Sequence, residues 1–478
     1  MTDSILATLI AVAVYVAELL GVGLAISRKR DAQSAIAWSL AILFLPVVGL
    51  LAFLVFGFER VPSRLKRKAA QTRNVRMLLR KKLTDSQSMP TMDARRGWQG
   101  MCMLAESAGA APVSGGNAMT LLAHGQPAFD SIVESIRAAK NHVHVEEYIF
   151  RDDRLGREIL DAMIERARAG VKVRLLLDAL GSFGNWRLIR RLRAAGGEGA
   201  VFMPLFPWFK TTFPNMRNHR KIIVVDGQIG FLGGLNVGEE YVGRRFKRRY
   251  WADAHVRISG PAVNEIQRVF LEDWEFATST LPDDPALFPH VAPQGSARVQ
   301  IISGGPDDEQ NALRHAYFAA ITSADKNLNI ATPYLVPDLA MREALKTAAM
   351  RGVDVTILTQ GKPPDSWLTY WASRYYWEEL LTVGVKLYEY PRGMMHAKML
   401  LADDAWAAVG SANLDNRSLR INFEVTAAID SQPDVAACYA RFAEELKRSR
   451  RITLKAFRKR RFMARAFEEV ARLAAPLL

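Results

Sequence analysis

The feature that most constrains the fold is a five-residue pattern that occurs twice at identical spacing. The pattern is His-x-Lys-x4-Asp-x6-Gly-x2-Asn, and its copies are His219, Lys221, Asp226, Gly233 and Asn236, and His396, Lys398, Asp403, Gly410 and Asn413. The chain has only eight histidines, so a chance match of two of them to this frame is very improbable. Two equivalent sites predict a paired active centre that arose by duplication.

The elements around the two copies repeat in the same order. In the first half a helix from about Phe129 precedes a strand at 142–148, a helix at 156–169 and a strand at 171–178. The second half repeats this with a helix at 311–322, a strand at 328–334, a helix at 338–350 and a strand at 353–359. Strands that alternate with helices indicate α/β units. We therefore expect two duplicated α/β sandwich domains that share a pseudo-two-fold active site.

Two long apolar runs at the N-terminus predict a transmembrane hairpin over residues 1–58. Ile5 to Ile26 contains one charge, Glu18, and as a helix spans about 33 Å, enough for a bilayer core. Residues 35–58 form a second apolar run interrupted by Pro46, which a membrane helix tolerates when neighbours satisfy the freed carbonyl. The alternative is a cleaved signal peptide, but the positively charged region that precedes such a peptide is missing.

The formal net charge of +15 is concentrated in two segments beside the body of the chain. Residues 59–100 carry twelve Lys and Arg against three acids, and residues 441–472 carry twelve against four. This placement favours attraction to an anionic membrane surface over nucleic-acid binding, although solvated helix faces remain an alternative. The segment after residue 58 carries more Lys and Arg than the turn between the two apolar runs, which favours a cytoplasmic location for the rest of the chain. Cys102 and Cys438 offer neither a disulfide framework nor metal-ligand spacing.

These observations divide the chain into five segments. After the hairpin we expect a basic linker at 59–110, a first domain at 111–290, a second domain at 291–440 and a basic amphipathic segment at 441–478. That last segment is either an interfacial helix or a helix docked on the body. Aromatic residues at 204–209 and 367–377 precede the two motifs and suit a membrane interface or packing between the halves. The basic run at 244–249 is a candidate attractor of an anionic headgroup.

The residue types of the paired motif suit phosphodiester chemistry. Two histidines supply a nucleophile and a proton donor, and the two lysines neutralise the anionic oxygens. We expect Asn236, Asn413 and Ser411 to help to bind phosphate, and the motif glycines to let the backbone approach it. Asp253 and Glu424 are candidates for orienting the histidines, or are structural acids. Asp226 and Asp403 are expected to organise the motif turns, and no metal or cofactor is expected.

The doubled motif resembles the signature of the phospholipase D superfamily, and the wider match is similar to bacterial cardiolipin synthases. The segments that carry this resemblance are residues 35–46, 56–57, 220–236, 403–424 and 472–478. The resemblance implies a catalytic set of His219, Lys221, Asp226, His396, Lys398 and Asp403, with His219 as nucleophile and His396 as general acid and base, or the reverse. Gly234 departs from the Gly-Ser that is frequent in the superfamily, which predicts unequal phosphate binding in the two halves.

The implied reaction transfers a phosphatidyl group from one phosphatidylglycerol to another at the bacterial inner membrane. Phosphatidylglycerol and anionic lipids are the expected partners, nucleic acid is not, and the oligomeric state is left open. A phospholipase D that forms phosphatidic acid is an alternative, because exclusion of water decides between the two. A synthase that uses phosphatidylethanolamine as donor, a nuclease and a non-enzymatic scaffold are further alternatives.

Overall fold

The computed structural model of the protein describes residues 2–28, 32–57, 68, 96–204, 215–243, 250–308, 310–391 and 393–478. The chain divides into two compact units. One comprises residues 1–67 and 205–216, and the other comprises residues 68–204 and 217–478. The first contains the N-terminal helices, and the second is the α/β body.

The N-terminal unit contains one helix of spanning length and two shorter ones. The helices are α1 (Thr2–Arg28), α2 (Ala32–Phe44) and α3 (Val48–Phe56). The stretch Ile5–Arg28 is long and apolar enough to cross a membrane, which agrees with the first predicted span. The second spanning helix expected at 35–58, with Pro46 tolerated inside it, is instead the two shorter helices α2 and α3. The helix breaks at Pro46, which lacks an N–H and clashes with the preceding turn, and Val47 adopts a φ of 63°.

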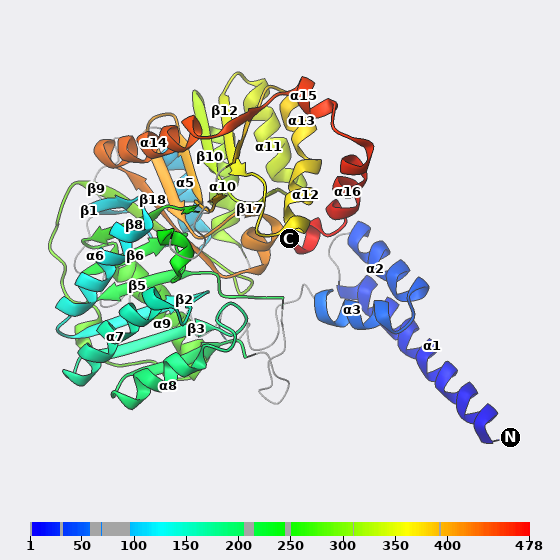
Figure 1. Cartoon of the computed structure of the whole chain (residues 1–478), viewed down its shortest axis with the longest axis horizontal. Coiled ribbons are helices and arrows are strands. Elements are labelled where there is room, and N and C mark those ends of the chain that lie inside the picture. The colour runs from blue at the N-terminus through cyan, green and yellow to red at the C-terminus, as the bar shows by residue number, and fades with distance from the viewer. Residues whose placement is uncertain are drawn as a thin grey trace. The chain divides into compact units, whose positions relative to one another are not determined.

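The body is built on one sheet of fifteen strands (Figure 1). The strands of the first half are β1 (Ser114–Leu122), β2 (His142–Glu147), β3 (Lys172–Asp178), β4 (Glu198–Phe202), β5 (Lys221–Val225), β6 (Ile229–Gly233) and β8 (His255–Ser259). Those of the second half are β9 (Ala297–Gly304), β10 (Asn327–Ala331), β12 (Asp354–Gln360), β13 (Lys386–Tyr390), β15 (Met399–Ala402), β16 (Trp406–Gly410), β18 (Glu424–Asp430) and β19 (Arg450–Ile452).

The strand order confirms the duplication. From the centre outward, the first half reads β1-β8-β6-β5-β2-β3-β4, and the second half reads β9-β18-β16-β15-β10-β12-β13 with β19 added at the edge. The predicted strands at 142–148, 171–178, 328–334 and 353–359 are β2, β3, β10 and β12. β1 and β9 pair antiparallel, so the two predicted domains share one continuous sheet, and the pseudo-two-fold axis passes between these strands.

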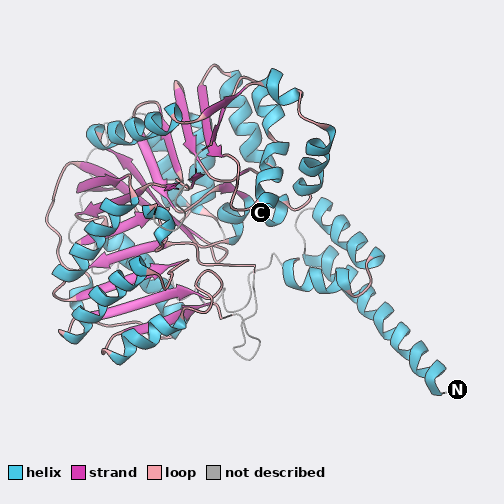
Figure 2. Ribbon diagram, viewed as in Figure 1, coloured by secondary structure: helices cyan, strands magenta, loops and turns pink. Residues whose placement is uncertain are grey.

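Helices cover both faces of the sheet (Figure 2). In the first half, α6 (Gly125–Ala138), α7 (Arg154–Arg168) and α8 (Trp186–Ala194) share a core with Val143 and Val145 of β2. Between these two valines, His144 points to the opposite face and stacks on Phe270 of α9 (Val263–Thr278) at 4.4 Å. The second half repeats the plan with α10 (Ala312–Ser323), α11 (Leu339–Met350) and α13 (Trp377–Thr382), whose core also includes Leu328 and Ile330 of β10.

The structure places parts of the two basic flanking segments inside the body. The predicted linker at 59–110 ends in α5 (Arg96–Ser107), whose buried Trp98 lies 5.6 Å from the ring of Trp406. Its apolar residues Trp98, Met101, Cys102 and Ala105 recur at helical spacing and join the core of the second half. The predicted boundary at residue 440 falls inside α14 (Gln432–Lys447). β19 then joins the sheet edge beside β13.

Asp226 and Asp403 fix equivalent turns, as the sequence predicts. Both have positive φ, 53° and 58°, a region that aspartate tolerates better than most residues. The Asp226 carboxylate accepts hydrogen bonds from the backbone N–H groups of Lys140, Asn141 and His142. The Asp403 carboxylate accepts those of residues 325–327. Each aspartate therefore anchors the start of β2 or β10, at the end of the motif hairpin remote from the histidine.

Candidate active site

The motif histidines lie at the carboxyl ends of the parallel strands of each half. His219 precedes β5, whose first residue Lys221 pairs with Glu147 at the end of β2. His396 precedes β15, whose first residue Met399 pairs with Ala331 at the end of β10. Loops at this edge of a parallel sheet form the usual binding crevice of α/β folds. The equivalent positions confirm that the two motifs occupy corresponding places in the two halves.

Backbone hydrogen bonds join each histidine to the opposite half. The His219 N–H donates to the carbonyl of Phe423 at 2.9 Å, and the Phe423 N–H donates to the carbonyl of Arg217 at 2.9 Å. In the mirror arrangement, the His396 N–H donates to the carbonyl of Ala252 at 2.7 Å. The segments β14 (Gly393–Met395) and β7 (Tyr250–Ala252) continue this parallel pairing. The residue after each carbonyl acceptor, Glu424 or Asp253, is thereby brought to a histidine of the other half.

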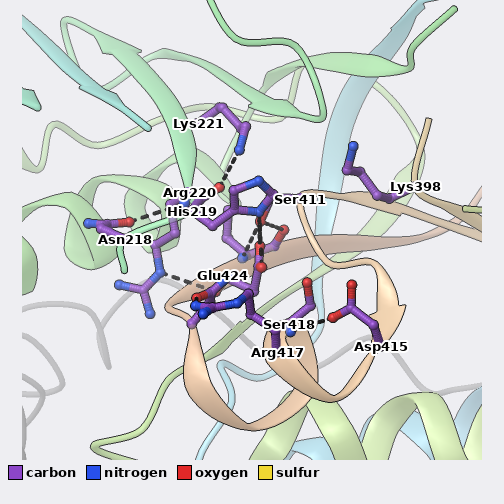
Figure 3. Close-up of polar contacts among 12 residues, drawn as sticks. Asn218, His219, Arg220, Lys221, Lys398, Ser411, Asp415, Arg417, Ser418 and Glu424 are labelled. Carbon is purple, nitrogen blue, oxygen red and sulfur yellow. Dashed lines mark hydrogen bonds and ion pairs between the residues drawn. The ribbon is translucent and has the colours of Figure 1, made fainter. Parts of the chain in front are cut away.

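The two candidate acids both contact histidines, but in a crossed arrangement. His219 Nδ1 lies 3.0 Å from each oxygen of Glu424 (Figure 3). His396 Nδ1 lies 2.5 Å from Asp253 Oδ2. Each acid therefore contacts the histidine of the opposite half and not that of its own motif. Because a carboxylate accepts at Nδ1, each imidazole holds its proton there and leaves Nε2 as the basic nitrogen.

The different residues at 234 and 411 lie against the two carboxylates, and phosphate binding by them stays a prediction. A Cβ at Gly234 would lie 2.0 Å from Asp253 Oδ1, so glycine leaves room for this acid. In the second half the Ser411 hydroxyl donates to Glu424 Oε2 and accepts the N–H of Val425. The hydroxyl that was expected to bind phosphate therefore stabilises an ionised Glu424.

The two carboxylates consequently differ in proton affinity. Burial raises the pKa of Asp253 to about 6, although Lys398 and the Ala254 N–H lower it in part. Burial also acts to raise the pKa of Glu424. The combined effect of His219, Lys221 and the Ser411 hydroxyl is larger, so the pKa of Glu424 is lowered. Near neutral pH Glu424 is thus the more firmly ionised acid. The pseudo-symmetric pair has one strongly anionic member and one that exchanges protons more readily.

The two lysines are buried cations that converge on the same region. Lys221 Nζ donates to the His219 carbonyl at 2.6 Å, and Lys398 Nζ donates to the His396 carbonyl. Burial lowers the pKa of Lys221 to about 7 and that of Lys398 to about 8, while Glu424 and Asp253 act to raise them. A buried ammonium with too few anionic partners is stabilised by an anion such as a phosphodiester.

Burial also keeps both imidazoles neutral. It lowers the pKa of His219 to about 4, with Lys221 and Lys398 contributing in the same direction against Glu424. The pKa of His396 is lowered well below its ordinary value by burial, by both lysines and by His219. That mutual influence shows that the two halves form one electrostatic site. A neutral imidazole is the nucleophilic form.

Asn236, the motif asparagine of the first half, is linked through Tyr241 to the histidine of the second half. The Asn236 amide donates to the Tyr241 hydroxyl at 2.6 Å, and the Tyr241 hydroxyl lies 3.4 Å from His396 Nδ1. Within the described ranges the side-chain carbonyls of Asn236 and Asn413 are buried without a hydrogen-bond partner. Asn236 thus supports the His396 side of the site through Tyr241. Phosphate binding by Asn236 and Asn413 stays a prediction.

Several site residues were not identified from the motif. The Tyr148 ring lies edge-on to the His219 ring, with 4.9 Å between the ring centres. Trp251 lies 5.2 Å from His396. Arg220 donates to the carbonyls of Glu424 and Gly304 and so ties the two halves together. Arg220 and Trp251 lie within two residues of a motif residue or an orienting acid, and Tyr148 lies at the end of a predicted strand. These positions in the sequence could have indicated that the three residues belong to the site.

The predictions about the aromatic groups, the basic run at 244–249 and the absence of a metal have different outcomes. The aromatic residues at 205–209 and the basic run at 244–249 lie outside the described residues. Of the second aromatic group, Tyr370 and Trp377 are core residues and Trp367 is half exposed. In the part of the chain that the structure describes, no group of three or more His, Cys, Asp or Glu side chains is arranged to hold a metal ion. The metal-free reaction stays a prediction.

Comparisons with known proteins show the family of the chain. A family model described as cardiolipin synthase, phospholipase D-like domain, matches residues 132–274 and 317–447. A phospholipase D-nuclease N-terminal model matches residues 10–57. A cardiolipin synthase of Geobacillus sp. (strain WCH70) is 38% identical over 468 residues, which covers 94% of this chain and 90% of the relative. The major cardiolipin synthase ClsA of Bacillus subtilis (strain 168) is 35% identical over 467 residues, covering 96% and 97%.

A solved structure supports the fold independently. The phosphatidylserine synthase of Haemophilus influenzae is 15% identical, with a TM-score of 0.55 over 75% of this chain and 95% of that chain. The sequence relatives extend over nearly the whole chain, and both motifs, their acids and their lysines occupy one duplicated site. The chain therefore belongs to the cardiolipin synthases, the phosphatidyltransferase family of the phospholipase D superfamily.

Proposed function

We propose that this protein transfers a phosphatidyl group from one phosphatidylglycerol to a second, and forms cardiolipin and glycerol. The observation that carries this proposal is the crossed pairing of His219 with Glu424 and of His396 with Asp253. It provides two imidazoles with free Nε2 atoms in one buried site, next to two lysine ammoniums. A nucleophile, an acid-base group and charge for the phosphoryl oxygens are the requirements for stepwise phosphodiester exchange.

In the first step His219 Nε2 attacks the phosphorus of the donor phosphatidylglycerol. A P–N bond forms, and the P–O bond to the headgroup glycerol breaks. Binding of the anionic phosphodiester raises the pKa of His396, so the imidazole takes up a second proton from solvent and gives it from Nε2 to the departing glycerol oxygen. Lys221 and Lys398 neutralise the non-bridging oxygens, where negative charge is concentrated in the transition state.

In the second step the terminal hydroxyl of a second phosphatidylglycerol replaces the histidine. His396 Nε2 removes the hydroxyl proton, a P–O bond forms, and the P–N bond to His219 breaks. The product is cardiolipin, and both histidines return to their starting states. If water replaced the second lipid, the product would be phosphatidic acid. Transfer to a lipid therefore requires that the buried surroundings of the histidines exclude water from the phosphohistidine intermediate.

The unequal acids support His219 as the nucleophile. A phosphoryl group on Nε2 withdraws electrons from the imidazole and makes the Nδ1–H more acidic. The Nδ1–H of the nucleophilic histidine therefore requires an acceptor that stays ionised. Glu424 meets that need because its pKa is lowered. The pKa of Asp253 is raised to about 6, closer to that of an imidazole, which suits a partner of the histidine that gains and loses protons.

The product test uses purified full-length protein and phosphatidylglycerol labelled in the headgroup glycerol. We expect equal amounts of cardiolipin and free labelled glycerol. His219→Asn and His396→Asn should each lower turnover by several orders of magnitude, whereas the exposed His290→Asn should not. Phosphatidic acid as the main product would overturn the proposed transfer, as would a near-normal rate in either active-site variant.

The depressed lysine pKa values predict a loss of activity at high pH. Lys221 and Lys398 are charged below about 7 and about 8 respectively, and they become neutral amines as the pH rises through these values. His219 is already neutral above about 4. We therefore expect kcat/KM, which reports the free enzyme, to fall as the pH rises above neutrality. Initial rates measured across neutral and alkaline pH check this, and an alkaline plateau without a fall would contradict it.

We also propose that the protein is a multi-pass protein of the bacterial inner membrane with its body in the cytoplasm. The supports are the spanning length of α1 and the basic residues 59–100 that follow the apolar region, which favour the cytoplasmic side. The broken pair α2 and α3 would form the return segment. Alkaline-phosphatase fusions after Ser34 and Gly100 should show high activity only at Ser34; high activity only at Gly100 would invert the topology.

A further inference from the structure

Two exposed tryptophans lie in corresponding connections of the duplicated body. Trp186 is the first residue of α8, in the connection from β3 to β4, and Trp367 is the first residue of α12 (Trp367–Tyr375), in the connection from β12 to β13. Their side chains are 69% and 50% exposed. Each has exposed apolar neighbours, Leu180 and Phe183 in the first connection and Leu368 in the second. Exposure of large apolar side chains in both copies indicates a common contact surface.

Both connections are tied to the active site. In the first, the Ser182 hydroxyl donates to the carbonyl of Tyr148 at 3.0 Å, and the Tyr148 ring packs against His219. In the second, the Tyr334 hydroxyl donates to Asp365, whose charge acts on Lys398. The exposed apolar side chains are therefore carried by the loops that flank the two motifs, at the carboxyl ends of the strands.

Helix α16 (Phe462–Arg472) extends this surface on the side of the second half. It lies beside α12 (Figure 1), where Phe467 stacks on Trp371 at 5.8 Å. One side of α16 remains exposed, and its apolar residues there are Phe462, Met463, Phe467 and Val470, with the exposed Leu473 directly after the helix. The chain after α16 packs on the second half, because the Leu478 carbonyl accepts the N–H of Arg417 in the segment that precedes Glu424.

The charge around these apolar residues is positive. Residues 454–472 contain seven Lys and Arg against two acids. Lys362 lies 5.0 Å from the ring centre of Trp371, and Arg187 is an exposed neighbour of Trp186. Apolar and aromatic side chains interleaved with cations match the interface of an anionic bilayer, where rings sit at headgroup level and cations meet lipid phosphates.

We propose that Leu180, Phe183 and Trp186, together with Trp367, Leu368 and the exposed side of α16, form a lipid-facing rim that seats the active site on an anionic bilayer. Both connections leave the carboxyl ends of parallel strands, the same ends at which His219 and His396 lie. A bilayer that contacts both connections is therefore adjacent to the site. This inference rests on the proposed function, since a lipid substrate must reach His219 and His396 from the bilayer.

The rim has a mechanistic consequence for the two substrates. Each phosphatidylglycerol could rise from the bilayer beside one connection, with its headgroup entering the site and its acyl chains staying in the lipid. Both donor and acceptor then reach the phosphorus without leaving the membrane. The apolar loops also displace water from the entrance, which favours a lipid hydroxyl over water as the second nucleophile.

The test places an environment-sensitive fluorophore at the rim of the full-length protein. Trp186→Cys and Trp367→Cys are labelled separately with bimane; the natural Cys102 and Cys438 are buried, so the new thiols react selectively. The labelled proteins are reconstituted in phosphatidylglycerol-containing vesicles with ordinary or brominated acyl chains. We expect brominated lipid to quench both labels severalfold, because rim side chains enter the boundary between headgroups and acyl chains.

Met350→Cys is the matched control. Met350 is as exposed as the tryptophans, at 73%, but it ends α11 just before β12, at the opposite end of that strand from Trp367. Its label should not be quenched. Equal quenching at all three positions, or none at Trp186 and Trp367, would overturn the rim. Labels shielded from aqueous iodide but unaffected by brominated lipid would identify a protein contact, and would also overturn it. The product assay is independent, so failure of the proposed function would be recognised separately.

Discussion

The active site depends on the exchange of acids between the two halves. Glu424 of the second half holds His219, and Asp253 of the first half holds His396, at 3.0 Å and 2.5 Å. The backbone bonds from His219 to Phe423 and from His396 to Ala252 fix this exchange. Neither half alone could orient its histidine. The duplication therefore produces one site that assembles only when the halves are joined through β1 and β9.

The same exchange allows a symmetric framework to carry unequal chemistry. One small difference, glycine at 234 and serine at 411, gives the two acids different surroundings. The Ser411 hydroxyl helps to keep Glu424 ionised, while Asp253 has a raised pKa. Because each acid acts on the opposite histidine, a change in one half alters the surroundings of the histidine in the other. The proposed division of roles therefore needs no change in the motif residues themselves.

Much of the fold and of the site could be predicted from the sequence, and the failures have physical causes. The motif spacing and the repeated elements specified two α/β units, both histidines, both lysines and both acids. The crossed pairing was not predictable, because position along the chain does not show which half a side chain enters. Helix α5 was missed because the basic residues before it obscured the helical spacing of Trp98, Met101 and Cys102. The break at Pro46 was underestimated because a membrane helix can tolerate proline.

The most direct test of the divided roles is to trap the phosphatidyl-enzyme. A phosphatidyl ester of p-nitrophenol suits this purpose, because its phenolate departs without a proton from His396. In Asp253→Asn, we expect the adduct to form and then to accumulate on His219, identified by mass spectrometry after alkaline quenching, because the second step needs His396 as a base. In Glu424→Gln, formation itself should be slow and no adduct should accumulate. An adduct on His396, or accumulation in Glu424→Gln instead, would contradict the crossed assignment.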